Sequence, residues 1–329
     1  MTFKYNNVYL ENTSTVTGPY EKKGPLGNFF DKSYDDLYCG NKTWEYAEVQ
    51  LILDSIDLVL KKQNKTKNDI DLHISGDLLN QTVASNYASA QIKRPFLGVY
   101  SACASSVETL IIGANMIESN QIKNCLCTTS SHNNSAEKQF RYPVEYGGPK
   151  PITTTFTTTG GVAAYLGREK KGVRIESATI GIVNDYGIKD VFHMGAVMAP
   201  AAADTIYRHL KDLKRDINYY DMILTGDLGV YGKDILKDFM KEEYNIELNN
   251  HDDAACMIFN RDKQPVLAGG SGPACAPLVT YSYIFEKMKE KQISKVLLVA
   301  TGALMNPSMT NEKEAIPSIA HAISLEAIK

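Results

Sequence analysis

The chain lacks the features that would assign it to a specialised class of protein. No apolar run in its 329 residues approaches the length of a membrane-spanning helix. No block of five or six like charges occurs and the net charge is −3, which disfavours a dedicated nucleic-acid-binding protein. Glycine and proline, at 23 and 12 residues, are too few for collagen or for long disordered segments. An ordinary globular protein with a sizeable core is therefore expected.

A secretory signal is also missing from the N-terminal stretch MTFKYNNVYLENTS, which has no apolar segment and no small-residue cleavage site. We therefore expect the protein to stay on the cytosolic side. In that reducing compartment, the six cysteines are expected to be buried thiols or one reactive site rather than three disulfides. A metal site at Cys125 and Cys127 would need more thiol or imidazole partners in the sequence, so burial of these cysteines is favoured and no metal site is expected. No cofactor is expected either.

Strand-like and helical stretches alternate along the chain. Apolar spacing predicts a helix over residues 45–62, and residues 98–120 are typical of a strand, a sharp turn and a helix. Pro200 is expected to begin a helix that runs through residue 211. Further strands are predicted at 70–76, 124–131, 153–167 and 173–183. This alternation indicates an α/β fold with mostly parallel sheets covered by helices.

The second half of the chain repeats the pattern of the first. Both halves carry Gly-Asp-Leu at the end of a strand, with Asp77 and Asp227 in matching positions. We expect these two aspartates to cap helices or tie turns. A second pair of segments, 99–131 and 269–303, shares a turn of small residues followed by a helix and a strand.

These repeats indicate an internal duplication of a βαβα unit. We expect one half at residues 1–183 and the other at residues 184–329.

The turn at Cys103 carries the clearest chemical signal. In the segment Tyr-Ser-Ala-Cys-Ala-Ser-Ser, residues 100–106, the cysteine lies where a strand gives way to a helix. The free N–H groups and partial positive charge of a helix N-terminus can lower the pKa of a thiol and bind anions. A buried cysteine that packs a tight turn fits the residues equally well. Both interpretations stay open on this segment alone.

A duplicated α/β chain with a cysteine at this turn resembles the thiolase superfamily. The resemblance implies a layered αβαβα fold in which the cysteine accepts an acyl group, helped by a histidine and by an asparagine or second cysteine from the other half. The matching turns here, 225–228 and 269–277, contain neither histidine nor asparagine, and 300–303 contains no cysteine. Acyl transfer needs such partners, so the resemblance implies a pocket that lacks its catalytic helpers.

Four further segments resemble the stage V sporulation protein AD family of endospore-forming bacteria. They are TSSHN (129–133), EKQFRYPVEYGG (137–148), GIKDVFHMG (187–195) and MAPAAADT (198–205). The resemblance extends from about Thr17 to the C-terminus. It implies a non-catalytic protein that binds dipicolinic acid (pyridine-2,6-dicarboxylate), alone or as its calcium chelate, and supports its uptake into the developing spore and its release at germination.

The same resemblance implies a homodimer in the forespore that is attached peripherally to the inner membrane through other stage V sporulation proteins. No nucleic-acid partner is expected. A site for a flat dianion needs donors for two carboxylates and an apolar wall. The donors include the helix N-terminus at Cys103 and a bidentate arginine, and the wall includes an aromatic ring, Tyr100, Phe140 or Phe192. The candidate ligand-binding residues are Cys103, Cys127, Ser130, His132, Arg141, Phe192, His193, Ser271 and Thr301.

Two alternatives remain. The chain could be an active thiolase or condensing enzyme in which Cys103 is the nucleophile and His132 or His193 is the base. It could also be a structural scaffold in a membrane complex, with a pocket that no longer serves a ligand.

Overall fold

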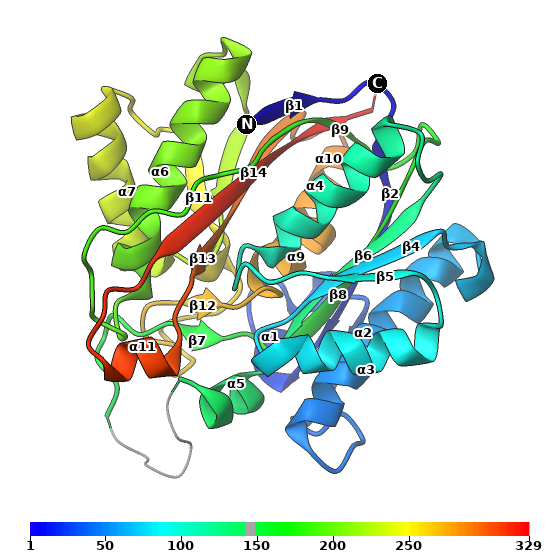
Figure 1. The fold of residues 1–329 in the computed structure, drawn as a ribbon, viewed down its shortest axis with the longest axis horizontal. Coiled ribbons are helices and arrows are strands. Elements are labelled where there is room, and N and C mark those ends of the chain that lie inside the picture. The colour runs from blue at the N-terminus through cyan, green and yellow to red at the C-terminus, as the bar shows by residue number, and fades with distance from the viewer. Residues whose placement is uncertain (142–148, 329) are drawn as a thin grey trace.

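The computed structural model describes residues 1–141 and 149–328; the segment 142–148 of the family resemblance lies outside these ranges. Figure 1 shows helices on the outside, two sheets within them, and further helices between the sheets. Helices α2 (Trp44–Gln63) and α3 (Val83–Ile92) cover one sheet, and α6 (Met194–Leu213) and α7 (Gly229–Tyr244) cover the other. The central layer contains α4 (Ser105–Glu118), α9 (Cys275–Val279) and α10 (Phe285–Lys289), which confirms the layered αβαβα arrangement.

The order of the strands records the duplication. The first sheet runs β5-β4-β6-β8-β2 and the second runs β11-β10-β13-β14-β9. The strands of the first sheet are β2 (Tyr9–Thr17), β4 (Leu72–Gly76), β5 (Phe96–Gly98), β6 (Cys125–Ser131) and β8 (Gly160–Gly167). Those of the second are β9 (Val173–Thr179), β10 (Met222–Thr225), β11 (His251–Asp253), β13 (Lys295–Ala303) and β14 (Ser318–Ala327). Numbered along the chain, each half therefore has the strand order 3-2-4-5-1.

The two sheets meet at one corner, where Tyr9 pairs with Arg174 and Leu10 with Val173. In this topology β9 corresponds to β2 and opens the second half, whereas the predicted division at residues 183 and 184 falls after it. That division stays a prediction, since strand pairing does not define where an independent folding unit ends.

The expectation of mostly parallel sheets is wrong. In each half the central strands are parallel, but β8 and β14 run antiparallel to both of their neighbours. The direction of these strands is set by pairings between segments far apart in the sequence, which local patterns do not report. The sequence analysis also missed β14 as a strand.

The predicted helix at 45–62 is confirmed, and local sequence explains its limits. Thr43 caps α2 by accepting a hydrogen bond from the backbone N–H of Tyr46, and Asn64 ends the helix in the left-handed conformation. The strands predicted at 70–76 and 124–131 are confirmed as β4 and β6. All seven residues of β6 are buried, as expected for a strand with helices on both faces.

Helix α6 does not begin at Pro200. It begins at Met194, and the Nδ1 atom of His193 accepts a hydrogen bond from the N–H of Ala196 as its cap. Pro200 therefore lies inside the helix, at the cost of one backbone hydrogen bond.

Shorter elements complete the described chain. They are α1 (Pro19–Lys22), α5 (Asn133–Gln139), α8 (Ala254–Met257), α11 (Pro307–Asn311), β1 (Thr2–Lys4), β3 (Lys32–Ser33), β7 (Phe156–Thr157) and β12 (Gly270–Ser271). A π-helical turn (Thr280–Ile284) joins α9 to α10. Over residues 1–141 and 149–328, no helix is both long and apolar enough to cross a membrane.

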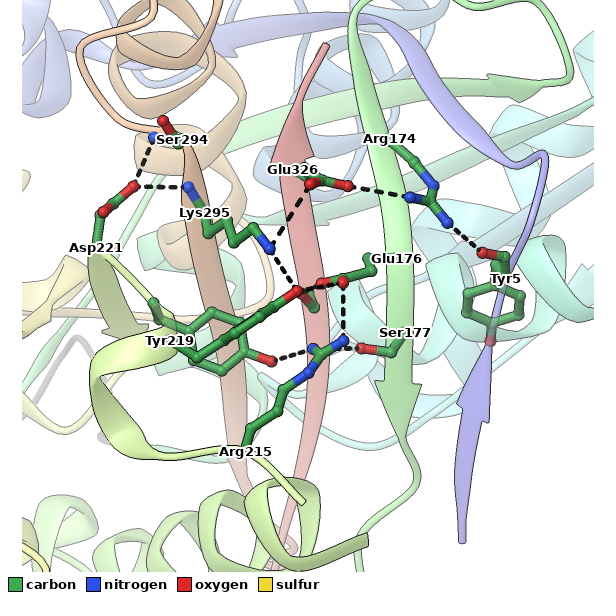
Figure 2. A network of polar contacts seen from close by, with 12 residues as sticks. Tyr5, Arg174, Glu176, Ser177, Arg215, Tyr219, Asp221, Ser294, Lys295 and Glu326 are labelled. Carbon is green, nitrogen blue, oxygen red and sulfur yellow. Dashed lines mark hydrogen bonds and ion pairs between the residues drawn. The ribbon is translucent and has the colours of Figure 1, made fainter. Parts of the chain in front are cut away.

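One end of the second sheet is held by a network of charges in which each carboxylate has partners (Figure 2). Glu176 accepts hydrogen bonds from Arg215 at 2.8 Å and from Ser324 at 2.9 Å. Glu326 forms an ion pair with Arg174 at 3.1 Å and a second, longer one with Lys295 at 3.7 Å. Burial raises the pKa of Glu176, but hydrogen bonds and the charge of Arg215 bring it below its usual value. These partners favour the charged form of the carboxylate, and the network ties β9, β13 and β14 together.

Candidate functional site

The turn that carries Cys103 is strained and firmly supported. Strand β5 ends at Gly98 and α4 begins at Ser105, and between them Ala102 has a φ of 49°, a left-handed conformation that costs about 1–2 kcal/mol for a residue with a side chain. The Oγ atom of Ser105 accepts from the N–H of Ser101 at 2.9 Å and donates to the carbonyl of Ala102 at 2.8 Å. Gly302 packs so closely that a Cβ there would lie 2.2 Å from the Ser101 carbonyl oxygen. These contacts fix the position of the half-buried Cys103.

A cavity lies beside Cys103 and has both an apolar wall and a polar side. The volume of the cavity that the centre of a water molecule can occupy is about 40 Å³. Its polar side includes Arg141, Thr155 and Ser271. Its apolar wall is formed by Leu78, Tyr100, Phe140, Met194, Met198 and Met305. Four of these residues, Leu78, Tyr100, Phe140 and Met305, also line a groove of about 440 Å³, which continues the cavity outward.

Arg141 contributes a positive charge to the cavity. Its Nη1 atom donates to Thr157 Oγ1 at 2.5 Å and to Ser271 Oγ at 3.1 Å, and its Nη2 atom donates to Thr155 Oγ1 at 2.9 Å. All three acceptors are neutral hydroxyl groups, and within residues 1–141 and 149–328 no carboxylate forms an ion pair with this guanidinium. The hydroxyls orient the guanidinium without neutralising its charge.

Asp227 lies next to Cys103 and is fully buried. The adjacent β13 explains the placement, because Thr301 donates to the Gly226 carbonyl while Gly302 packs against the Cys103 turn. Asp227 has a φ of 74°, and neither of its carboxyl oxygens has a hydrogen-bond partner within the described residues. Burial, and then the charge of Asp253, raise its pKa well above the usual value. A raised pKa favours the neutral, protonated form of this carboxyl group.

The expectation that Asp227 caps a helix is wrong, because Asp253 accepts the hydrogen bonds at the start of α7 instead. Asp253, at the end of β11, accepts from the N–H groups of Leu228 at 3.3 Å and Gly229 at 3.1 Å, at the start of α7. It also accepts from Thr225 Oγ1 at 2.6 Å and from the N–H of Ala255 at 3.1 Å. The sequence analysis did not single out Asp253, since only the fold brings β11 beside β10.

The Cys103 thiol is not activated. Burial, and then the charge of Asp227, raise its pKa well above the ordinary value, and the opposing effects of Arg141 and the Gly272 amide are smaller. A thiol with a raised pKa stays protonated, and the thiol is a far weaker nucleophile than the thiolate. The proposed lowering of its pKa by the helix N-terminus is therefore wrong for this turn.

Three of the nine predicted ligand-binding residues, Cys103, Arg141 and Ser271, line the cavity together. Tyr100 and Phe140, two of the three aromatic candidates, line it as well.

Three other predicted residues are buried in the sheets and do not line the cavity. The thiol of Cys127 donates to the Thr109 carbonyl at 3.2 Å. Ser130 donates to the buried carboxyl of Glu48 at 2.9 Å. Thr301 supports the turn before Asp227 through the Gly226 carbonyl.

The remaining three predicted residues are also outside the lining. His132 bonds through Nε2 to the Leu37 carbonyl at 2.7 Å, and His193 caps α6. Phe192 precedes that cap and does not line the cavity. Neither histidine of the enzyme alternative lines the cavity beside Cys103.

Metal ligands are not grouped in the part of the chain that the structure describes: no three His, Cys, Asp or Glu side chains lie together as a metal ion would need.

Comparison with solved structures places the fold. The chain is similar over 99% of its length to all of 3-oxoacyl-[acyl-carrier-protein] synthase III from Aquifex aeolicus, with a TM-score of 0.55 and 14% identity. It is similar over 98% of its length to 99% of human mitochondrial 3-ketoacyl-CoA thiolase, with a TM-score of 0.59 and 11% identity. A variant of OleA from Xanthomonas campestris gives a TM-score of 0.62 at 12% identity, with 98% of this chain and 99% of that one covered. The fold is thiolase-like.

Sequence comparison identifies the family. The family model described as stage V sporulation protein AD matches residues 1–326. The stage V sporulation protein AD of Bacillus subtilis (strain 168) is 49% identical over 319 residues, which cover 97% of this chain and 94% of that protein. The chain, with its thiolase-like fold and its unactivated cysteine, therefore belongs to the stage V sporulation protein AD family.

Proposed function

We propose that this protein is a non-catalytic receptor that binds dipicolinate, alone or as its calcium chelate, in the cavity beside Cys103. The observation that carries the proposal is Arg141, whose guanidinium lines the cavity and, among the described residues, has only neutral hydroxyl groups as hydrogen-bond partners. A guanidinium held in this way fits a carboxylate through two parallel hydrogen bonds. The family membership supports a role in sporulation.

The shape and composition of the cavity support a flat aromatic ligand. Tyr100 and Phe140 present aromatic rings, and Met194, Met198 and Met305 are flexible side chains that adapt to a ligand's outline. The space beside Cys103 admits only a few atoms as it stands, so a ring the size of dipicolinate requires methionine side chains to move. The continuous groove provides a path from the surface.

The protonated thiol and the absence of a histidine from the cavity lining support binding without acyl transfer. Removing a proton-transfer partner from a nucleophilic site typically costs orders of magnitude in rate. A raised thiol pKa adds to that loss, because less thiolate is present at neutral pH.

The biological setting forms part of the same proposal. The protein supports dipicolinate uptake into the developing spore and its release at germination. It acts in the forespore as a homodimer, attached to the inner membrane through other stage V sporulation proteins. Native mass spectrometry at low concentration tests the dimer, and a monomer there would contradict it.

Calorimetry with the purified protein tests the binding. Dipicolinate or its calcium chelate should bind more tightly than benzoate, which has one carboxylate, and phthalate, in which the two carboxylates are adjacent. Arg141→Gln should weaken dipicolinate binding by roughly 100-fold, given the 1.5–3 kcal/mol typical of a hydrogen bond to a charged group. Lys138→Gln is the matched control, because Lys138 pairs with Glu45 outside the cavity lining. Absence of binding at millimolar dipicolinate would overturn the proposal.

Intact-mass measurement after incubation with acetyl-CoA tests the enzyme alternative separately. The wild type should remain unmodified. An acetyl adduct that disappears in Cys103→Ser would instead favour acyl transfer.

A further inference from the structure

We propose that Asp227 binds the ligand as a neutral carboxylic acid, whose O–H donates a hydrogen bond to a ligand carboxylate that Arg141 also holds. At a pH where free Asp227 is ionised, ligand binding is then accompanied by the uptake of one proton. This inference rests on the proposed function and adds to it a means of release and a basis for specificity.

The first step concerns the two oxygens of Asp227. Both are buried and neither has a hydrogen-bond partner in the described parts of the chain. An ionised carboxylate without partners is very unfavourable in such a place, so the group carries a proton. A neutral carboxyl group has one O–H donor, and here that donor has no acceptor.

The second step concerns the groups around Asp227. Arg141 and the amide of Gly272 can only donate hydrogen bonds, and both favour the charged form of Asp227. The Cys275 thiol also favours the charged form of Asp227, and the Cys275 and Cys103 thiols, both with raised pKa values, are protonated and accept only weakly. Asp253 uses its oxygens to accept from the N-terminus of α7. The neighbours of Asp227 therefore supply donors but no strong free acceptor.

The third step is an internal comparison with the matching residue of the first half. Asp77 is also fully buried, yet its Oδ1 accepts from the N–H of Leu79 at 2.9 Å and its Oδ2 from the N–H of Ser85 at 2.8 Å. Asp227 has the same Gly-Asp-Leu setting and none of these bonds. The Gly-Asp-Leu motif alone therefore does not leave its carboxyl group without hydrogen-bond partners. That feature belongs to Asp227 and to its position beside Cys103 in the second half.

The fourth step is charge complementarity. Arg141 supplies a positive charge without a carboxylate among the described residues, and protonated Asp227 supplies a neutral donor. Asp227 is fully buried and does not line the cavity as it stands, so a carboxylate held by Arg141 reaches it when the lining side chains move, as the size of the ligand already requires. When Asp227 loses its proton, its negative charge repels a doubly negative ligand. The site therefore holds its ligand under acidic conditions and releases it as the pH rises.

The test measures dipicolinate binding by calorimetry from mildly acidic to alkaline pH, in pairs of buffers that differ in ionisation enthalpy. The wild type should take up close to one proton on binding above the pKa of Asp227. Its affinity should fall about tenfold per pH unit there. Asp227→Asn keeps a neutral donor and tolerates the positive φ, so it should bind without proton uptake and with an affinity that does not change with pH.

Asp77→Asn is the matched control and should retain the pH dependence of the wild type. Both measurements are repeated in the Cys103→Ser background, so that ionisation of the thiol makes no contribution. Asp253 is present in every variant, so its titration cancels from the comparison.

The outcomes separate the two proposals. No binding by the wild type at any pH overturns the proposed function. Binding with the same pH dependence in wild type and Asp227→Asn overturns this inference alone. Difference infrared spectroscopy of wild type against Asp227→Asn, without ligand, should show the carbonyl band of a protonated carboxyl at neutral pH, and its absence would also overturn the inference.

Discussion

Asp77 and Asp227 occupy the same position in the two halves of a duplicated chain, and only one of them holds the fold together. Asp77 accepts hydrogen bonds from two backbone N–H groups in the segment that leads into α3. Asp227 accepts none, because Asp253 has taken over the N-terminus of α7. Buried polar groups without partners are uncommon in folded proteins, and each one calls for an explanation.

The comparison shows how a duplicated fold can release a residue from a structural role. A second carboxylate on the neighbouring strand β11 satisfies the backbone groups that the first would otherwise serve. The freed carboxyl then lies near Cys103 of the other half, where its charge raises the pKa of the thiol. The charge network of Figure 2, in which Glu176 and Glu326 are paired, shows the usual arrangement of charged carboxylates in the same protein.

The largest expected effect concerns Glu48, the fully buried carboxyl that neighbours Asp77 in the first half. Burial, and then the charge of Asp77, raise the pKa of Glu48 from 4.5 to about 8. Between these two pKa values the folded state holds a proton on Glu48 that the unfolded state has lost. The contribution of protonated Glu48 to the free energy of unfolding is therefore complete below pH 4.5 and is lost as the pH rises to about 8. Glu48→Gln should remove this loss.

Urea denaturation from acidic to alkaline pH measures the effect. The free energy of unfolding of Glu48→Gln should exceed that of the wild type by several kcal/mol at alkaline pH. The two values should be similar under acidic conditions, because glutamine also accepts a hydrogen bond from Ser130 or Ser135. A wild type whose stability does not fall with rising pH relative to the variant would show that Glu48 is ionised in the fold.

The next effect separates the two aspartates directly. Asp77→Asn replaces one acceptor with an NH₂ group that faces a backbone N–H, so the free energy of unfolding should fall by about 1–3 kcal/mol. Asp227→Asn removes no hydrogen bond within the described residues and should change stability by less than about 1 kcal/mol, or increase it. Urea denaturation of both variants measures the difference. Equal losses would mean that the two carboxyls serve the fold alike.

Much of the fold could be predicted from the sequence, because its signals are local. The apolar spacing of 45–62, the buried run at 124–131 and the repeated Gly-Asp-Leu motif gave α2, β6 and the duplication. The direction of β8 and β14 could not be predicted, because pairing direction depends on contacts far apart in the sequence. The start of α6 was missed because Pro200 was taken as a beginning, whereas His193 provides the cap.

The candidate site was predictable only where its chemistry lies in one segment. Cys103 was found from its turn, and Arg141 and Ser271 from their types and positions, and these three meet at the cavity. The freedom of Asp227 depends on Asp253, which lies 26 residues further along the chain on another strand. No local pattern reports such a replacement, so it becomes visible only when the hydrogen bonds of both carboxyls are known.

The smallest expected effect concerns the reactivity of Cys103. After burial, the charge of Asp227 is the main cause of the raised pKa of this thiol. Asp227→Asn should therefore lower that pKa and increase the rate of alkylation by iodoacetamide severalfold at alkaline pH, where the wild-type Asp227 carboxyl has lost its proton, with mass spectrometry used to assign the modified residue. Asp77→Asn should leave the rate unchanged, because Asp77 is not among the groups that shift the thiol pKa. An equal rate in wild type and Asp227→Asn would mean that Asp227 is too far from the sulfur to act on it, and the contrast between the two halves would then lose its link to the cavity.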